Sequence, residues 1–236
     1  MTISDPGSPL VSILVPTLDE ERELPALLDD LAALHGRWEI IMADGGSRDA
    51  TVAIARAHSS RPLVLEASGG RAAQLNAAAR AASGDVLLFL HADSRLPRHA
   101  YASLAEAWRT DGVAGGNFAL RFAGDGAFER VLGAVYRFQR GHGYYYGDSS
   151  VWLRCERFAE LGGYREIPIM DDYDFVRRLE RGPGRTRCLP GPATTSARRW
   201  RSMGIARTVL AWFVIRWLYV AGVSPERLVR LYRIVR

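Results

Sequence analysis

Short apolar runs alternate with helical patterns along the first half of this chain, and this rhythm limits the folds open to it. The runs cover residues 11–15, 38–43, 63–66 and 86–90, and leucines or alanines at helical spacing lie between them. Such alternation is typical of βαβ units, in which helices connect parallel strands and cover the sheet. We therefore expect one α/β, Rossmann-like domain with a mainly parallel central sheet and helices on both faces.

The second half of the sequence is less regular than the first. It predicts a helix that begins near Pro97, a strand over residues 112–122, a strand over 149–153, a helix over 171–181 and a Gly/Pro/Arg-rich connection over 177–192. With 236 residues, the chain is long enough to bury the core of one large domain. We place this domain at residues 1–200.

The segment from Met203 to Val223 is the most hydrophobic of the chain, but Arg207 and Arg216 interrupt it. A charged residue in the centre of a membrane span costs about 2.5–3.5 kcal/mol on insertion scales, so a spanning helix is not expected. We expect residues 201–236 to form a basic, aromatic and amphipathic helical segment. It either packs on the domain or lies in the membrane interface.

Basic charge is concentrated at the C-terminal end. Residues 177–236 hold 14 Arg against Glu180 and Glu226, a net charge of +12, although the whole chain carries only +5. Such a tail suits phosphorylated substrates or anionic lipid, and its interleaving with Trp and Phe favours a membrane surface over nucleic acid. A solvated basic face is the alternative interpretation.

Cysteine usage and the first residues bear on localisation. Cys155 and Cys188 show no metal-ligand spacing and suggest free thiols in a reducing compartment. Residues 1–10 hold no basic stretch of the kind that opens a signal sequence. We expect a cytoplasmic protein, peripheral at the inner membrane face where the C-terminal segment contacts lipid.

Polar side chains follow three of the predicted strands, where each strand ends. Asp19 and Glu20 follow the first strand, Asp44 the second and Asp93 the fourth. Ligands of open parallel sheets bind outside the carboxyl ends of the strands, so these carboxylates should share one edge. Their mutual repulsion requires a cation or ligand donors. Taken singly, Asp44 is equally well explained as a helix cap.

Four motifs in order resemble family 2 glycosyltransferases of the GT-A fold. They are Val15-Pro16-Thr17 with Asp19-Glu20, Asp44-Gly45-Gly46-Ser47-Arg48-Asp49-Ala50-Thr51, Gly70-Arg71-Ala72-Ala73-Gln74-Leu75-Asn76 and His91-Ala92-Asp93. The resemblance implies an inverting enzyme that uses a nucleotide-diphosphate sugar. It places the donor against Pro16, Thr17, Glu20, Asp44, Gly45, Gly46, Arg71, Gln74, Asn76, His91 and Asp93.

The cation site implied by the resemblance departs from the family pattern. The family's Asp-x-Asp motif holds the donor ribose and a divalent cation, and here His91 stands in place of the first Asp. The resemblance therefore leaves Asp93 as the ligand of Mg²⁺ or Mn²⁺. A metal there stabilises the negative charge that develops on the leaving nucleoside diphosphate.

The acceptor side is implied by the segment that opens with Asp171 and Asp172. Asp172 matches the family's general base, which accepts the proton of the acceptor hydroxyl. Acidic residues also favour the first turn of any helix, which is the structural interpretation of this pair. Acceptor or phosphate contacts are further expected from Asp171, Arg199, Trp200 and Tyr145. Because Ser196 stands where processive members carry Gln, processivity is not expected.

The sequence thus predicts transfer of a sugar to a hydroxyl of a lipid, a saccharide or a small molecule. Two alternatives stay open: a nucleotidyltransferase, and a non-catalytic nucleotide-sugar-binding module. The acidic Asp19-Glu20-Glu21 stretch disfavours nucleotidyl transfer, which would want a Gly-rich, basic phosphate loop there. The donor base, the sugar and the acceptor are decided by pocket side chains that motifs do not reveal.

Overall fold

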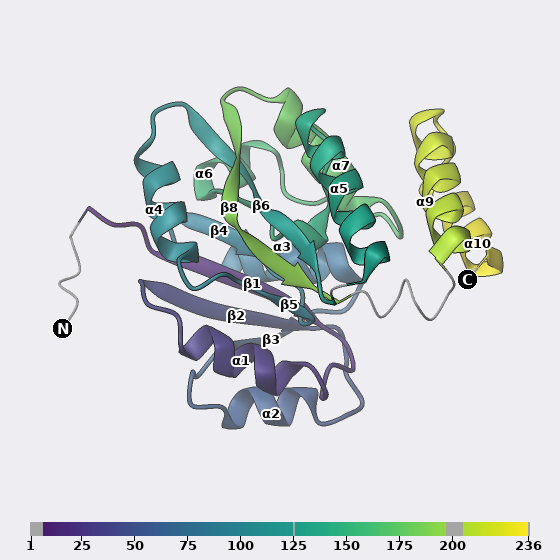
Figure 1. Ribbon diagram of the computed structural model, residues 1–236. Coiled ribbons are helices and arrows are strands. Elements are labelled where there is room, and N and C mark those ends of the chain that lie inside the picture. Colours follow the sequence, from purple (N-terminus) through teal and green to yellow (C-terminus); the bar gives the residue numbers. More distant parts are fainter. Residues whose placement is uncertain (1–6, 125, 197–204, 236) are drawn as a thin grey trace.

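The computed structural model describes residues 7–124, 126–196 and 205–235. Its first half is a run of alternating strands and helices (Figure 1). In chain order these are β1 (Val11–Thr17), α1 (Leu24–Ala32), β2 (Trp38–Asp44), α2 (Thr51–Ala57), β3 (Leu63–Glu66), α3 (Arg71–Ala81) and β4 (Val86–Phe89). The four strands predicted in this half are confirmed, with bounds that differ by at most two residues.

The second half adds strands and helices of less regular order. They are β5 (Ser94–Arg95), α4 (Ala100–Arg109), β6 (Val113–Phe122), α5 (Ala127–Gly141), the 3-10 turn η1 (Gly147–Ser149), β7 (Trp152–Arg154), α6 (Cys155–Glu160), α7 (Asp171–Arg181), β8 (Arg185–Thr195), α9 (Ile205–Val220) and α10 (Pro225–Val235). The helix predicted over residues 171–181 is confirmed as α7.

All the strands of the described chain join one sheet in the order β3-β2-β1-β4-β7-β6-β8-β5. The pairs within β3-β2-β1-β4 are parallel, and so is the pair of β6 with β8. β7 is antiparallel to β4 and to β6, and β5 is antiparallel to β8. The expected mainly parallel sheet is therefore confirmed, with antiparallel pairing confined to the short strands β5 and β7.

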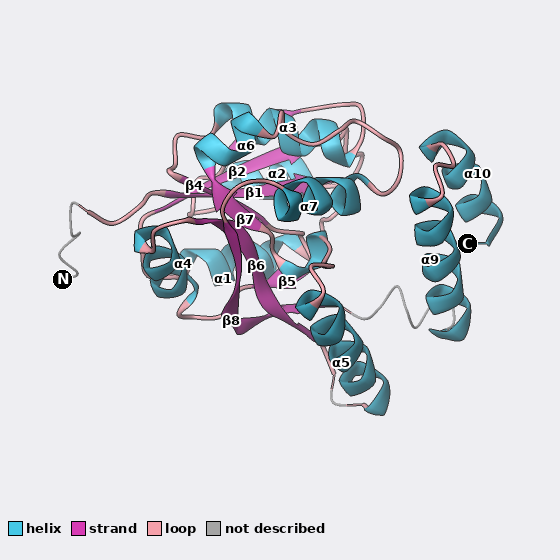
Figure 2. Cartoon of the chain, turned by 90° about the horizontal axis from the view of Figure 1, so that it is seen from above, coloured by secondary structure: helices cyan, strands magenta, loops and turns pink. Residues whose placement is uncertain are grey.

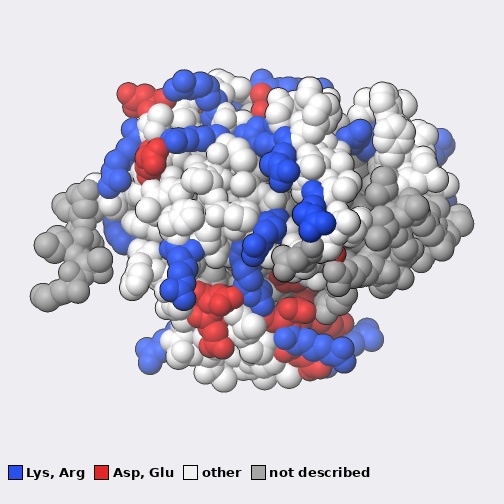
Figure 3. Space-filling view, viewed as in Figure 1, with Lys and Arg blue, Asp and Glu red and all other residues white. Residues whose placement is uncertain are grey.

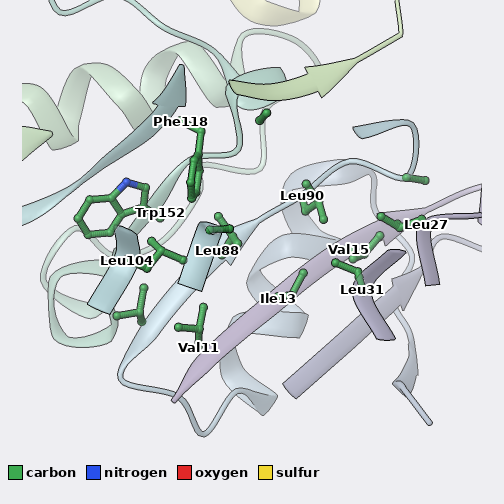
Figure 4. Packing of buried hydrophobic residues seen from close by; sticks show 14 of the residues in the cluster. Val11, Ile13, Val15, Leu27, Leu31, Leu88, Leu90, Leu104, Phe118 and Trp152 are labelled. Carbon is green, nitrogen blue, oxygen red and sulfur yellow. The ribbon is translucent and has the colours of Figure 1, made fainter. Parts of the chain in front are cut away.

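Helices cover both faces of the sheet, as the alternation predicted. Successive β1 residues point to opposite faces, so Val11, Ile13 and Val15 enter one buried cluster and Leu14 enters the other. The first cluster includes Leu27 of α1 and is drawn in Figure 4. The second receives α3 and α7, and Figure 2 shows α3 and α6 across the sheet from α1 and α4.

The Gly/Pro/Arg-rich connection predicted over residues 177–192 is wrong. Instead, α7 continues to Arg181, and β8 begins at Arg185 and pairs with the long strand β6. Two prolines disfavour a central strand, because proline has no backbone N–H for the ladder. Here the register moves from Phe118↔Leu189 to Leu120↔Ala193, so Pro190 and Pro192 lie in a bulge outside the regular pairing.

The strand expected over residues 149–153 is displaced in the structure. Residues 147–149 form the turn η1, and the strand β7 begins only at Trp152. Ser150, between them, has a left-handed φ of 53°. The short turn inserts before the strand and aims residues 147–149 at the carboxyl edge of the sheet.

The C-terminal helices α9 and α10 pack on the domain near the start of α7. Ile215 and Leu228 form a buried cluster with Met170 and Tyr173, and the Tyr219 hydroxyl donates to Asp174 Oδ1 at 3.2 Å. No helix within the described ranges is long and apolar enough to cross a membrane.

Candidate active site

The carboxyl ends of β1, β2 and β4 meet at one edge of the sheet, because these strands are parallel neighbours. Asp44 is the last residue of β2, and Asp93 lies just beyond β4. The N-terminus of α7, with Asp171 and Asp172, reaches the same edge through Arg71 at the start of α3. The structure therefore gathers carboxylates from separate stretches of the sequence, as expected.

The Asp44 carboxylate is buried and accepts hydrogen bonds from neighbouring residues. Oδ2 accepts from the backbone N–H groups of Gly46 at 2.9 Å and Ser47 at 2.8 Å, and Oδ1 accepts from the Ser47 hydroxyl at 2.5 Å and the Thr17 hydroxyl at 3.3 Å. Although burial acts to raise its pKa, the bonds from Ser47, Gly46 and Thr17 hold the Asp44 pKa below its ordinary value. In the structure it shapes the loop at Gly45, and its contact with the nucleotide-sugar donor stays a prediction.

Gln74 and Asn76 bind backbone atoms in the structure. Gln74 is buried, and its Nε2 donates to the carbonyls of Thr17 at 2.7 Å and Ala43 at 2.8 Å, which braces α3 against β1 and β2. Asn76 donates to the Tyr164 carbonyl and accepts from the Tyr164 N–H, both at 2.9 Å. Both amides therefore position α3, and direct donor contacts by them stay predictions.

The loops after β1 and β2 are tied to each other at the far end of the same edge. Arg48 N–H donates to Asp19 Oδ1 at 2.8 Å, and Glu20 N–H donates to the Thr51 hydroxyl at 2.8 Å. A hollow of about 380 Å³ lies against these loops and is lined by Asp19, Glu20, Glu21, Arg22, Glu23 and Asp49. Its acidic lining suits a group that donates hydrogen bonds, and repels phosphate.

On the face seen in Figure 3, acidic side chains gather mainly in the lower part, where α1 lies in Figure 1, whereas arginines spread over the upper part. The hollow does not include Asp93 or Asp172. The acidic end and the centre that holds Arg71 are therefore two different parts of the edge.

Arg71 connects the start of α3 with the start of α7. Its Nε and Nη2 donate to the two oxygens of Asp171 at 3.0 and 2.5 Å, and Nη2 lies 3.5 Å from Asp172 Oδ2. Such a bidentate pair fixes the planar guanidinium in orientation as well as position. The Arg71 side chain is 36% exposed, so it is also open to a ligand from solvent.

The Asp172 carboxylate is held in place by backbone donors. Oδ2 accepts from Gly147 N–H at 3.2 Å, and Oδ1 accepts from Tyr173 N–H at 2.7 Å. Burial acts to raise its pKa, but the Arg71 charge, these N–H groups and His91 together hold the pKa of Asp172 below its ordinary value. The carboxylate is therefore ionised and oriented at neutral pH.

His91 lies beside the turn that carries Gly147. A Cβ atom added at Gly147 would meet His91 Nε2 at 3.0 Å and Asp172 Oδ2 at 3.5 Å. Gly147 therefore fits between the imidazole and the carboxylate because it has no side chain. His91 thus stands at the centre of the site, beside the Asp172 carboxylate.

Asp148 is a residue of this site that the sequence reasoning missed. Burial, followed by the charge of Asp172 and that of Asp93, raises the pKa of Asp148 to about 7, while a hydrogen bond from Tyr136 opposes the rise. The sequence signal was the Gly147-Asp148 pair that ends the aromatic Tyr144–Tyr146 stretch. Only the fold shows that this turn reaches the ends of β4 and α7.

A cation site is only partly assembled by the side chains present. Within residues 7–124, 126–196 and 205–235, no group of three or more His, Cys, Asp or Glu is arranged to hold a metal ion. Across the same ranges, no hydrogen bond or ion pair holds the Asp93 carboxylate, and the buried Asp148 Oδ1 has no hydrogen-bond partner. Magnesium sites commonly use only one or two protein carboxylates plus substrate phosphates, so the donor set fits such a cation.

The expected acceptor residues are placed unevenly. Tyr145 lies in the core at 2% exposure under the Arg140 guanidinium, and acceptor contact by it stays a prediction. Its neighbours Tyr144 and Tyr146 instead stack on Tyr173 of α7, with ring centroids 6.3 and 6.1 Å apart. The expected residues Arg199 and Trp200 lie outside the described residues.

Two curated proteins of related sequence share part of this chain. The dolichyl-phosphate beta-glucosyltransferase of Drosophila melanogaster is 32% identical over 139 residues, covering 49% of this chain and 43% of the relative. The undecaprenyl-phosphate 4-deoxy-4-formamido-L-arabinose transferase of Aeromonas hydrophila is 34% identical over 108 residues, covering 42% of this chain and 33% of the relative. The chain spans less than half the length of either relative.

Solved structures share the fold. A mannosyltransferase from Pyrobaculum calidifontis, in complex with GDP-Man and Mn²⁺, superposes with a TM-score of 0.62 at 22% identity, covering 80% of this chain and 56% of that one. Residues 1–349 of S. aureus TarS, in complex with UDP-GlcNAc, give a TM-score of 0.63 at 15% identity, with 79% and 58% covered. These likenesses show the GT-A fold.

The family is decided by the sequence match. The model of the family described as "Glycosyl transferase family 2" matches residues 12–159, which is more than half of the chain. The match includes the strands β1 to β4, the helix α3 with Arg71 and the turn that carries Gly147. The chain belongs to glycosyl transferase family 2.

Proposed function

We propose that this protein transfers a sugar from a nucleotide-diphosphate donor to an acceptor hydroxyl, with inversion at the anomeric carbon. The observation that carries the proposal is the placement of the Asp172 carboxylate. It is ionised, oriented by Gly147 N–H, and lies 3.5 Å from the Arg71 guanidinium. In this proposal the base Asp172 and the phosphate-binding guanidinium of Arg71 lie side by side at the carboxyl edge of the sheet, where ligands of such sheets bind.

Asp172 acts in this proposal as the general base. Inversion needs one carboxylate that removes the acceptor proton while the acceptor oxygen attacks the anomeric carbon from the face opposite the leaving group. Asp172 needs a free oxygen lone pair for that proton, and a carboxylate has about four. The two hydrogen bonds that it accepts from backbone N–H groups leave this capacity available.

The donor extends along the edge from the acidic hollow to Arg71. Its nucleoside lies near Pro16, Thr17, Glu20 and Asp44, and its diphosphate approaches Arg71. A phosphate oxygen can replace an Asp171 oxygen on the planar guanidinium, because both anions suit bidentate donors. Asp171 is then the residue that keeps Arg71 in place before the donor arrives.

A divalent cation, Mg²⁺ or Mn²⁺, is included in the proposal. The Asp93 carboxylate, which has no hydrogen-bond or ion-pair partner within the described part of the chain, is the residue that would hold it, and the Mn²⁺ in the solved mannosyltransferase is consistent with this choice. When bound, the cation neutralises charge on the leaving diphosphate. The fit rests on the Asp93 carboxylate and the Asp148 Oδ1 atom, to which no described residue donates a hydrogen bond.

We propose a lipid-linked acceptor of the polyprenyl-phosphate kind. The names of both relatives contain such a phosphate, and the helix α9 lies next to the acceptor side through Tyr219 and Asp174. One face of α9 is exposed and apolar, and comprises Leu210, Phe213, Val214, Trp217 and Val220. In this proposal that face meets the cytoplasmic side of a membrane, where interfacial aromatic residues are favourable.

The division into a transferase domain at 1–200 and a C-terminal segment at 201–236 is retained as a proposal. The contacts of Ile215 and Leu228 with Met170 support a segment that packs on the domain near the base. In this proposal the packed segment brings a lipid acceptor close to Asp172.

The alternatives differ in what they predict for the donor. A nucleotidyltransferase would cleave the bond between the α- and β-phosphates of a nucleoside triphosphate, and a silent module would bind nucleoside diphosphate without releasing it from a sugar. The acidic lining of the hollow argues against a triphosphate pocket there.

A thermal-shift panel of UDP-, GDP- and dTDP-sugars, with and without Mn²⁺, tests the proposal first. A ligand that binds only the native state raises the melting temperature by mass action. We expect one donor class to raise it, more strongly with Mn²⁺, and that donor to be hydrolysed slowly to nucleoside diphosphate. Binding without any hydrolysis or transfer in the presence of lipid phosphate acceptors would favour the silent module.

A further inference from the structure

Asp148 has one carboxylate oxygen that the fold leaves without a donor. Its Oδ1 is fully buried, and no described residue donates a hydrogen bond to it. The side chain otherwise interacts with the Tyr136 hydroxyl of α5. A buried carboxylate oxygen without a donor carries a desolvation penalty, which native structures usually avoid.

The surroundings of Asp148 increase this cost. The preceding residue, Gly147, lies beside His91 Nε2 and Asp172 Oδ2. The turn η1 therefore lies between the loop after β4 and the start of α7. The negative charges of Asp172 and Asp93 both act on Asp148. Both charges therefore oppose the ionisation of Asp148.

The nearby guanidinium of Arg71 already contacts two other carboxylates. Arg71 makes its two short bonds to Asp171, at 2.5 and 3.0 Å, and its contact with Asp172 is the longer one at 3.5 Å. Asp93 has no hydrogen-bond or ion-pair partner in the described residues. Among the residues that the structure describes, Asp93 and Asp148 are therefore two carboxylates that form no ion pair with an arginine.

We propose that Asp148 is a second protein ligand of the divalent cation, and that it binds the ion together with Asp93. The inference rests on the proposed function, since that function brings a cation to this edge. Two carboxylates are enough for Mg²⁺ or Mn²⁺ when water and diphosphate oxygens complete the shell. Asp148 then supplies the second carboxylate of the site, where the family's motif begins with His91 instead of Asp.

This assignment predicts opposite effects of one substitution on ion affinity and on stability. Asp148→Asn removes a carboxyl group whose ionisation is unfavourable next to Asp93 and Asp172, so the ion-free variant should melt at the same temperature as the wild type or higher. The same change removes a ligand, and Mn²⁺ affinity should fall roughly tenfold or more, by comparison with losses of that size for outer-shell changes. A structural Asp148 would give a lower melting temperature and unchanged affinity.

Titration of the full-length protein with Mn²⁺ alone, followed by electron paramagnetic resonance of the free ion, measures the affinity directly. Asp111→Asn is the matched control, because Asp111 is an exposed carboxylate before β6, at the opposite edge of the sheet. We expect the control to bind Mn²⁺ like the wild type and Asp148→Asn to bind at least tenfold more weakly. Equal affinity of Asp148→Asn and wild type would overturn the assignment.

A second measurement needs no variant and covers the case in which Asp148→Asn does not fold. Fe²⁺ in place of Mn²⁺, with ascorbate and hydrogen peroxide, cleaves the backbone next to the bound ion. We expect cuts near residues 91–94 and also near 146–149, both suppressed by excess Mg²⁺. Cuts near 91–94 alone would overturn a role for Asp148. Both measurements are independent of sugar transfer, so an inactive enzyme with this ion site would contradict the proposed function and leave this inference standing.

Discussion

At the scale of single residues, Arg71 shares its charge between Asp171 and Asp172, and this sharing sets the ionisation of the proposed base. The guanidinium favours the ionised form of Asp172 and lowers its pKa. A base that is held ionised in this way stays active at acidic pH, but it is a weaker proton acceptor. When the donor phosphate takes over the Arg71 guanidinium, the pKa of Asp172 should rise, which makes Asp172 a stronger base for the reaction.

Arg71→Met tests this coupling through the pH dependence of kcat/KM. Without the guanidinium, the pKa of Asp172 should rise, and the acid limb of the profile should move to higher pH by roughly one to three units. Arg71→Lys keeps a charge and should move it less. An acid limb that stays at the wild-type pH in Arg71→Met would show that Arg71 does not set the ionisation of the base.

Asp148 predicts a pH dependence of stability in the ion-free protein. Its pKa is raised from 3.8 to about 7 by burial and by the charges of Asp172 and Asp93, with Arg71 and Tyr136 opposing. The folded state therefore binds this proton more tightly than the unfolded state. Stability should fall as the pH rises from about 4 to about 7, by at most about 1.4 kcal/mol per unit from this group.

Urea unfolding in the presence of EDTA, repeated across this pH range, measures that slope. Asp148→Asn should remove this component of the slope, while Asp111→Asn should keep it. The same slope in Asp148→Asn and wild type would mean that other groups produce the dependence.

The sequence named part of this candidate site. Asp93 follows a predicted strand, whereas Arg71 and Asp172 were named because their segments resemble motifs of the family. Asp148 was missed because its partners are close in space and distant in sequence. The hydrogen bonds of Gln74 to backbone carbonyls could not be predicted either, because a motif does not show whether its amide side chain contacts a ligand or a carbonyl.

At the scale of helices and strands, Gln74 holds helix α3 in position against strands β1 and β2. Gln74→Ala leaves the carbonyls of Thr17 and Ala43 without a donor, at a cost of about 1–3 kcal/mol each when buried. We expect a lower urea midpoint and reduced kcat/KM for every donor alike. Arg80→Ala, an exposed change on the same helix, should leave the midpoint unchanged. A normal midpoint with a selectively raised donor KM would instead support direct donor contact by Gln74.

The exposed face of α9 carries a prediction about membrane contact. Phe213 and Trp217 are 52% and 57% exposed and lie in edge contact with each other. The double change Phe213→Ser with Trp217→Ser should reduce sedimentation with vesicles that contain anionic lipid, because it removes interfacial aromatic area. Leu63→Ser, a similarly exposed apolar residue of β3, serves as the control. Unchanged sedimentation of the double variant would exclude this face as the membrane contact.

Strand β8 shows why local patterns fail at the level of elements. Its prolines and glycine predict a connection, yet the long neighbour β6 supplies a ladder that tolerates a bulge at residues 190–192. Propensity is overridden there by tertiary pairing. The strands β1 and β4, in contrast, are buried on both faces, so their apolar runs were sufficient to predict them.

At the scale of the whole molecule, one topological fact creates the site. The order β3-β2-β1-β4 brings the ends of β1, β2 and β4 to one edge, and the antiparallel β7 lets the turn η1 and α7 close over it. The alternation of strands and helices was enough to predict that edge. The return of residues 147–172 to it depends on pairing across the sheet, which no periodicity encodes.

Asp172→Asn tests most directly whether Asp172 is the base at this edge. The amide has nearly the same shape but cannot accept the proton, so kcat for sugar transfer should fall roughly 100-fold or more while the Kd for the donor stays near the wild-type value. Transfer assays and donor titrations on the same preparation measure both quantities. Transfer by Asp172→Asn at the wild-type rate would contradict the account.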